Sequence, residues 1–129
     1  MANPSAASVR LSGPFESHIA EHYLFFERQD PDTAQARLDA LVDRLLEGIG
    51  HIASHPEIGR PAWFLKATHP QAKAELTRAQ ALAEQYGVGQ FRELVLKPYL
   101  MLYAHGESGI VVLGLRHGRQ LLYYGEGPD

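Results

Sequence analysis

The stretch FRELVLKPYLMLYAHGESGIVVLGLR, residues 91–116, contains three apolar segments separated by two short turn signals. Residues 97–98 (KP) and 106–109 (GESG) have the length and composition of hairpin turns. The segments 91–97, 99–105 and 109–116 therefore predict an antiparallel meander of three strands. The last segment is apolar at nearly every position, which is typical of a strand that is covered on both faces.

The sequence before the meander predicts helices. Residues 14–29 carry large apolar side chains at helical spacing, and Asp30 followed by Pro31 predicts the start of a second helix that runs to about Ser54. So short a connection between two helices predicts an antiparallel helical hairpin. Residues 9–13 alternate weakly and predict a short edge strand.

A third helical pattern lies between the hairpin and the meander, near residues 70–86. Its apolar face consists mainly of alanines, including Ala72, Ala79 and Ala83. Such small side chains predict a helix that packs weakly or remains partly exposed.

The order of these elements predicts an α+β fold. We expect an N-terminal helical hairpin packed on a twisted antiparallel sheet of three or four strands, with the extra helix inserted near residues 70–86. The length of 129 residues fits one domain, 1–129, and the small polar residues 1–7 are expected to be disordered.

The composition excludes several classes of protein. There is no cysteine, which rules out disulfide scaffolds and cysteine-ligated zinc. No segment has the apolar length of a signal peptide or a membrane span, so we expect a cytoplasmic protein with no membrane role. The net charge of −3 is atypical of nucleic-acid binders, so binding of that kind would need a local basic patch.

Residues 18–22, HIAEH, match the H-x-x-E-H pattern of a class of zinc enzymes. Two histidines four residues apart on a helix can share a zinc ion, with Glu21 as a base. A zinc enzyme would need a third ligand from elsewhere, and five residues match easily by chance. We therefore predict two polar histidines on an amphipathic helix, and we expect neither a metal nor a cofactor.

Cations gather where the last predicted strand ends. Arg116, His117 and Arg119 lie within four positions, and aromatic residues follow them. Arginine and histidine beside aromatic rings suit an anion, such as a phosphate, an RNA backbone or an acidic protein segment. The alternative is a solvated charged turn. Arg92 would join this cluster only if the strand registers allow it.

Several segments occur together in an order that resembles a known family. They are the helical hairpin, residues 55–61 (HPEIGRP), residues 91–104 (FRELVLKPYLMLYA) and residues 109–120 (GIVVLGLRHGRQ). Together they resemble the RelE/ParE superfamily of bacterial type II toxins, in its ParE-like plasmid-stabilisation branch. The resemblance covers about residues 8–64 and 89–124. Residues 65–88 depart from it, because family members usually have a short connection there.

The resemblance implies a growth-inhibiting toxin that a cognate antitoxin neutralises, and it leaves two targets open. ParE-like members block DNA gyrase by protein contact, whereas RelE-like members are metal-independent nucleases that cut mRNA on the ribosome. Nuclease members carry an arginine directly after the tyrosine that corresponds to Tyr99, but here Leu100 follows it, and Leu94 replaces another expected cation. This favours gyrase. If the chain were nevertheless an enzyme, the remaining catalytic set would be Arg92, Arg116, His117, Arg119 and Tyr123.

The same resemblance implies a surface for the target and the antitoxin. We expect an extended or helical antitoxin segment to cross the hairpin and the sheet and to fold on binding. The candidate contact residues are Arg92, Arg116, His117, Arg119, Trp63 and Phe64. For the two loop aromatics the alternative is packing as a hydrophobic lid. A third functional class also stays open, a non-toxic interaction domain, as do a homodimer and a toxin–antitoxin hetero-oligomer.

Overall fold

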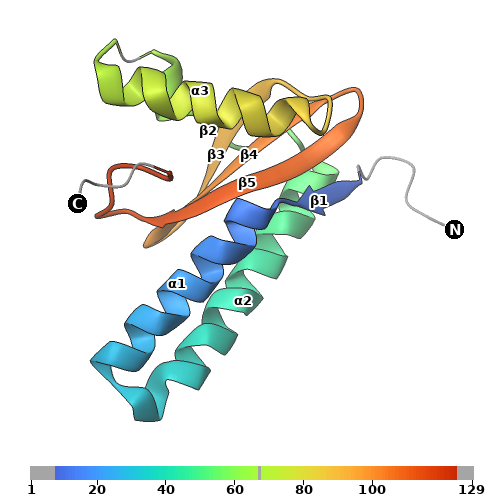
Figure 1. The fold of residues 1–129 in the computed structure, drawn as a ribbon. Helices are drawn as coiled ribbons and strands as arrows, with labels where there is room; N and C mark the ends of the chain where they lie inside the picture. The colour runs from blue at the N-terminus through green and yellow to red at the C-terminus, as the bar shows by residue number, and fades with distance from the viewer. Residues whose placement is uncertain (1–7, 67, 125–129) are drawn as a thin grey trace, which may run out of the picture.

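The computed structural model describes residues 8–66 and 68–124, and Figure 1 shows its fold. The prediction of disorder for residues 1–7 lies outside the described residues. The elements follow in the order β1 (Val9–Leu11), α1 (Gly13–Gln29), α2 (Pro31–Ser54), β2 (Arg60–Pro61), η1 (Trp63–Leu65), α3 (Pro70–Glu84), β3 (Gln90–Leu96), β4 (Tyr99–Gly106) and β5 (Gly109–His117). The α+β class, the helical hairpin, the edge strand and the inserted helix are confirmed.

Local signals fix where the helices begin. Ser12 caps α1, where its Oγ accepts the Phe15 N–H at 3.3 Å. Asp30 caps α2, where its Oδ1 accepts the Asp32 N–H at 3.2 Å, and the same residue ends α1. In each helix a proline occupies the first or second position, where its missing N–H costs nothing. One residue therefore turns the chain between α1 and α2.

Over residues 8–66 and 68–124, the sheet has five strands in the order β1-β5-β4-β3-β2. The meander of β3, β4 and β5 is antiparallel as predicted, and β2 adds to it antiparallel, but β1 runs parallel to β5. The sheet is therefore mixed and one strand larger than expected. The additional strand, β2, has only two residues and contains Pro61, so no alternating pattern marks it in the sequence.

Helices cover both faces of the sheet. Figure 1 shows the α1–α2 hairpin on one side of the strands and α3 on the other. Alternate residues of β4 divide accordingly: Met101 and Tyr103 join the core under the hairpin, whereas Leu100 and Leu102 join the core under α3. The prediction that the strand at 109–116 is covered on both faces is confirmed.

The inserted helix α3 packs more closely than its sequence predicted. Ala72, Ala79 and Ala83 are each 0% exposed. The expectation of weak packing was therefore wrong for this face, because small alanine side chains let the helix pack against the sheet. The alternative, a helix that remains partly exposed, is confirmed by exposed residues such as Lys73 and Arg78. The buried face of α3 also carries one carboxylate, Glu75, which is 1% exposed.

Side chains complete the outer edge of β5 beyond the point where β1 ends. The Leu113 carbonyl accepts the Ser12 hydroxyl at 3.4 Å and the Tyr124 hydroxyl at 3.1 Å. The Leu115 N–H donates to Nδ1 of His18 at 3.0 Å. A buried strand edge needs such partners, and here α1 and the C-terminal segment supply them.

Candidate functional site

The strand register separates the cations that the sequence places side by side. Arg116 lies opposite Leu100 and His117 lies opposite Tyr99. Because successive strand residues point to opposite faces, Arg116 belongs to the face under α3 and His117 to the face under the hairpin. Arg92 lies opposite Tyr103, further along the sheet, so the predicted cluster does not form one patch.

Arg116 lies inside the molecule. It is 8% exposed, and its Nη2 is 3.6 Å from Oε2 of Glu93. Its Nη1 donates to the carbonyl of Gln120, and its guanidinium lies 5.2 Å from the centre of the Tyr123 ring. A buried and paired guanidinium of this kind holds the C-terminal segment against the sheet.

Glu93 is the centre of this buried network and is 0% exposed. Its carboxylate accepts hydrogen bonds from the Tyr123 hydroxyl at 2.7 Å and from the backbone N–H of Trp63 at 3.1 Å. The carboxylate also lies 3.5 Å from Nε of Arg60. Burial first and the Glu93 charge second raise the pKa of Tyr123 well above its usual value. Tyr123 therefore keeps its proton and donates it to Glu93 in a hydrogen bond.

A second buried carboxylate, Glu75 of α3, holds the same segment. It accepts the backbone N–H groups of Tyr123 at 2.8 Å and of Tyr124 at 2.9 Å. Our sequence reasoning missed both glutamates as site residues. The sequence does mark both residues as charges on apolar faces. Glu75 lies three residues after Ala72 on one face of a helix, and Glu93 lies two residues after Phe91 on one face of a strand.

Arg92 anchors a loop. Its Nη1 donates to the carbonyls of Gly59 at 2.8 Å and Glu57 at 3.3 Å, and its Nε donates to Nε2 of His105 at 3.1 Å. The Tyr103 hydroxyl binds the same loop, donating to the Pro56 carbonyl at 2.6 Å. Arg92 thus positions residues 56–59 on the hairpin face of the sheet.

The two loop aromatics differ in exposure. Phe64 is 1% exposed and packs edge-on against Phe91, with 6.1 Å between ring centres. Trp63 is half-buried and stacks on His69 at 5.8 Å. Phe64 therefore matches the hydrophobic-lid alternative, whereas part of Trp63 reaches the surface.

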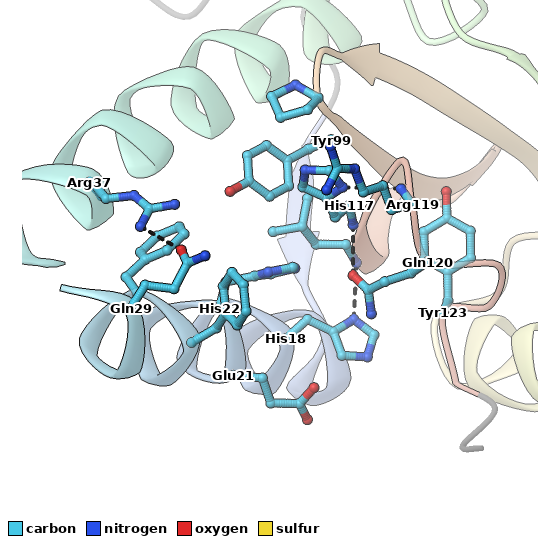
Figure 2. A pocket seen from close by; sticks show the side chains of 14 residues that line it. His18, Glu21, His22, Gln29, Arg37, Tyr99, His117, Arg119, Gln120 and Tyr123 are labelled. Atoms are coloured by element: carbon cyan, nitrogen blue, oxygen red, sulfur yellow. Dashed lines mark hydrogen bonds between the residues drawn. The ribbon is translucent and has the colours of Figure 1, made fainter. Parts of the chain in front are cut away.

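A cavity of about 510 Å³ lies between α1 and the ends of β4 and β5. Figure 2 shows it, and we call it the α1 cavity. It brings together His117 and Arg119, two of the predicted cations, with histidines that the sequence offered as a metal motif. Its lining consists of His18, Glu21, His22, Phe25, Phe26, Gln29, Arg37, Pro98, Tyr99, Leu115, His117, Arg119, Gln120 and Tyr123.

Hydrogen bonds fix the protons of two of these histidines. Nδ1 of His18 accepts the Leu115 N–H, and Nδ1 of His117 accepts the Arg119 N–H, each at 3.0 Å. In a neutral imidazole the other nitrogen then carries the proton, so Nε2 of each ring is a donor. A metal ion needs a lone pair, whereas these rings offer N–H groups. No described residues form a group of three or more metal ligands.

His18 and His117 both act electrostatically on His22. Burial first, and the neighbouring His18 and His117 next, lower its pKa from 6.5 to about 4. Burial also lowers the pKa of His18. The cavity therefore holds His18 and His22 neutral at physiological pH, and an added negative charge would be needed to protonate them readily.

Acidification should destabilise the fold through His22. Its pKa is lower in the folded chain than in the unfolded chain, so the unfolded chain binds the proton first and stability falls as the pH drops from about 6.5 towards about 4. We expect the free energy of unfolding to be about 1–2 kcal/mol lower at about pH 5 than at about pH 7 from this group. Urea unfolding at both pH values measures it. His22→Gln should remove that part, and the exposed His51→Gln should leave it unchanged.

The comparison with protein families agrees with the fold and the motifs. A family model described as the ParE toxin of the type II toxin-antitoxin system parDE matches residues 9–122. A search of curated proteins found no match. In the described part of the chain, no helix is long and apolar enough to span a membrane. The family implies a cognate antitoxin as partner. The chain belongs to the ParE toxin family of type II toxin–antitoxin systems.

Proposed function

We propose that this toxin inhibits DNA gyrase by protein contact and that it does not cut RNA. The observation that carries the proposal is the burial of Arg116 and Tyr123, both of which Glu93 engages under α3. These are two of the positions that a RelE-like nuclease would use. The family match agrees with this reading, because ParE-like members are the gyrase-directed branch.

The chemistry of RNA cleavage supports the same choice. Without a metal, cleavage needs a base, an acid and several cations around one phosphate. Here Arg116 and Tyr123 lie on the α3 side, His117 on the hairpin side, and Arg92 further along the sheet. A raised pKa makes Tyr123 a poor proton donor to a leaving oxygen. His117, Arg119 and Tyr123 do line the α1 cavity. Glu93, however, engages Arg116 and Tyr123, and Arg92 lies elsewhere, so the full set does not surround one scissile phosphate.

The end of the sheet offers a surface for protein contact. Arg60, Lys97 and Arg119, which we call the cationic rim, are exposed around a shallow concavity whose floor includes Val95. Val95 is 45% exposed, and Leu121, two residues after Arg119 in the chain, is 74% exposed. An apolar patch edged by cations suits an acidic protein surface. We place the gyrase contact here, and we expect the antitoxin to cover it.

Two assays on the purified chain test this function. We expect inhibition of gyrase supercoiling while transcripts stay intact in a translating extract. A double replacement, Lys97→Ala with Arg119→Ala, should weaken the inhibition by about tenfold or more, because two charges at an interface are removed. Arg78→Ala removes an exposed cation from α3 and serves as the matched control. Cleaved transcripts would overturn the proposal, and so would a folded chain that affects neither process.

A further inference from the structure

The α1 cavity has a charge balance that favours an anion. Arg37 and Arg119 both line it, and neither makes an ion pair within the described parts of the chain. Among the described residues, Glu21 is the only carboxylate in the lining, and Figure 2 shows it pointing away from Tyr99 and His117. A pocket with two arginines and no carboxylate turned inward attracts negative charge.

The histidines of the cavity add donors to these cations. In its neutral form, each of the His18 and His117 rings carries the proton on Nε2, because a backbone N–H occupies Nδ1. Gln120 accepts the His117 N–H through Oε1 at 2.7 Å, which leaves its amide nitrogen as another donor. N–H donors such as Nε2 of His117 and the Gln120 amide fit the oxygens of a phosphate, whereas the ring of His18 already hydrogen-bonds the Tyr123 backbone.

Aromatic surface lines the rest of the cavity. The Tyr99 ring stands edge-on to His22 at 5.2 Å and to His117 at 5.5 Å between ring centres. Phe25 is 46% exposed at the cavity, and the Arg37 guanidinium lies 4.1 Å from the centre of the Phe26 ring. Flat apolar rings beside a guanidinium are the surfaces on which nucleic-acid bases stack.

We propose that the α1 cavity binds a nucleoside phosphate, with the phosphate between His22, His117 and Arg119 and the base towards Phe25 and Arg37. The volume of about 510 Å³ is within the range of small-ligand sites and suits one nucleotide. The two cations stand at opposite ends of the cavity in Figure 2, with His22 and Tyr99 between them. One arginine can therefore bind the phosphate while the other stacks on the base.

Binding should strengthen on acidification. The groups that face His22 are His18 and Glu21 of α1, Arg37 of α2, Tyr99 of β4, His117 of β5 and Arg119. A bound phosphate places negative charge among them and raises the pKa of His22, so proton and phosphate bind together. The affinity for a phosphate ligand should rise as the pH falls from about 7.5 towards about 5.5, while that for an uncharged nucleoside should not.

Calorimetric titration of the purified chain tests the proposal with AMP, adenosine, inorganic phosphate and a 5′-phosphorylated oligonucleotide. AMP should bind at least about tenfold more tightly than adenosine or phosphate, since it uses both ends of the cavity. Equal binding of AMP and oligonucleotide points to a nucleic-acid end as the source, whereas AMP alone points to a free nucleotide. Both results support the site.

Two variants and one control locate the binding. Arg119→Gln and His22→Phe should each weaken AMP at least about tenfold, and His51→Gln on the exposed side of α2 should not. Absence of AMP binding by the folded chain would overturn the inference, and so would equal affinity for AMP and adenosine. Tighter binding of an acidic peptide than of AMP would also overturn it. Neither gyrase nor antitoxin is present in this titration, so its failure leaves the proposed target untouched.

Discussion

Replacement of Glu93 by alanine should lower the free energy of unfolding by about 3–5 kcal/mol. The carboxylate is 0% exposed and is the charge partner of the buried Arg116. Its loss leaves that guanidinium uncompensated in a place that water reaches poorly. The replacement also removes the acceptor of two hydrogen bonds, one from the Tyr123 hydroxyl and one from the backbone N–H of Trp63. Chemical denaturation, followed by Trp63 fluorescence, measures the change.

The matched control is Glu107→Ala, which removes an exposed carboxylate from the turn between β4 and β5. It should change stability by less than about 0.5 kcal/mol. A double variant, Glu93→Gln with Arg116→Met, removes both charges and should recover much of the lost stability. If Glu93→Ala were as harmless as Glu107→Ala, the buried network would not hold the sheet end together.

The second large effect is expected at Gly59. A Cβ at this position would lie 2.7 Å from the Glu93 carbonyl oxygen and 2.7 Å from the Tyr103 hydroxyl. The backbone cannot yield without breaking the hydrogen bond from the Gly59 N–H to Tyr103, which is 2.9 Å long. Gly59→Ala should therefore cost about 3 kcal/mol, at the upper end of the usual range for overpacking. Thermal and urea unfolding of the variant measure it.

Gly50→Ala is the opposite case in the same chain. This glycine is exposed within α2, and a Cβ there meets nothing within 4 Å. Alanine is the better helix former, so this change should raise stability by about 0.5–1 kcal/mol. Similar effects of the two replacements, in either direction, would contradict the close approach at Gly59.

Much of the fold follows from local signals. Asp30 with Pro31 marks the turn of the hairpin, and the alternation along residues 99–105 divides the two cores correctly. The close packing of α3 on the sheet could not be predicted in the same way. A face of alanines allows a helix to pack closely, but whether it does depends on the surface that lies against it. The two-residue strand β2 and the parallel pairing of β1 depend on long-range contacts, which no local pattern encodes.

The candidate site was harder to predict for a geometric reason. Residues that are adjacent in the sequence of a strand point to opposite faces of the sheet. Arg116 and His117 therefore lie on different faces. A register irregularity between Leu102 and Tyr103 shifts which residues of β5 share a face. Neither the separation nor the shift can be placed without the pairing of β4 and β5. The sequence identified His18 and His22 as a pair, but their placement opposite Arg119 depends on how α1 lies across the sheet.

The order in which the chain is synthesised determines when the buried network can form. Tyr123 follows Glu93 by 30 residues and Glu75 by 48, yet it binds both side chains. At ribosomal speeds, the interval between Glu93 and Tyr123 is about 2–6 s. During that time the hairpin can form, but β4 and β5 are still being made, so the sheet remains incomplete and its end unclosed. The nascent chain therefore passes through a stage in which the helical hairpin is present while the C-terminal segment that Glu75 and Glu93 hold has still to be made.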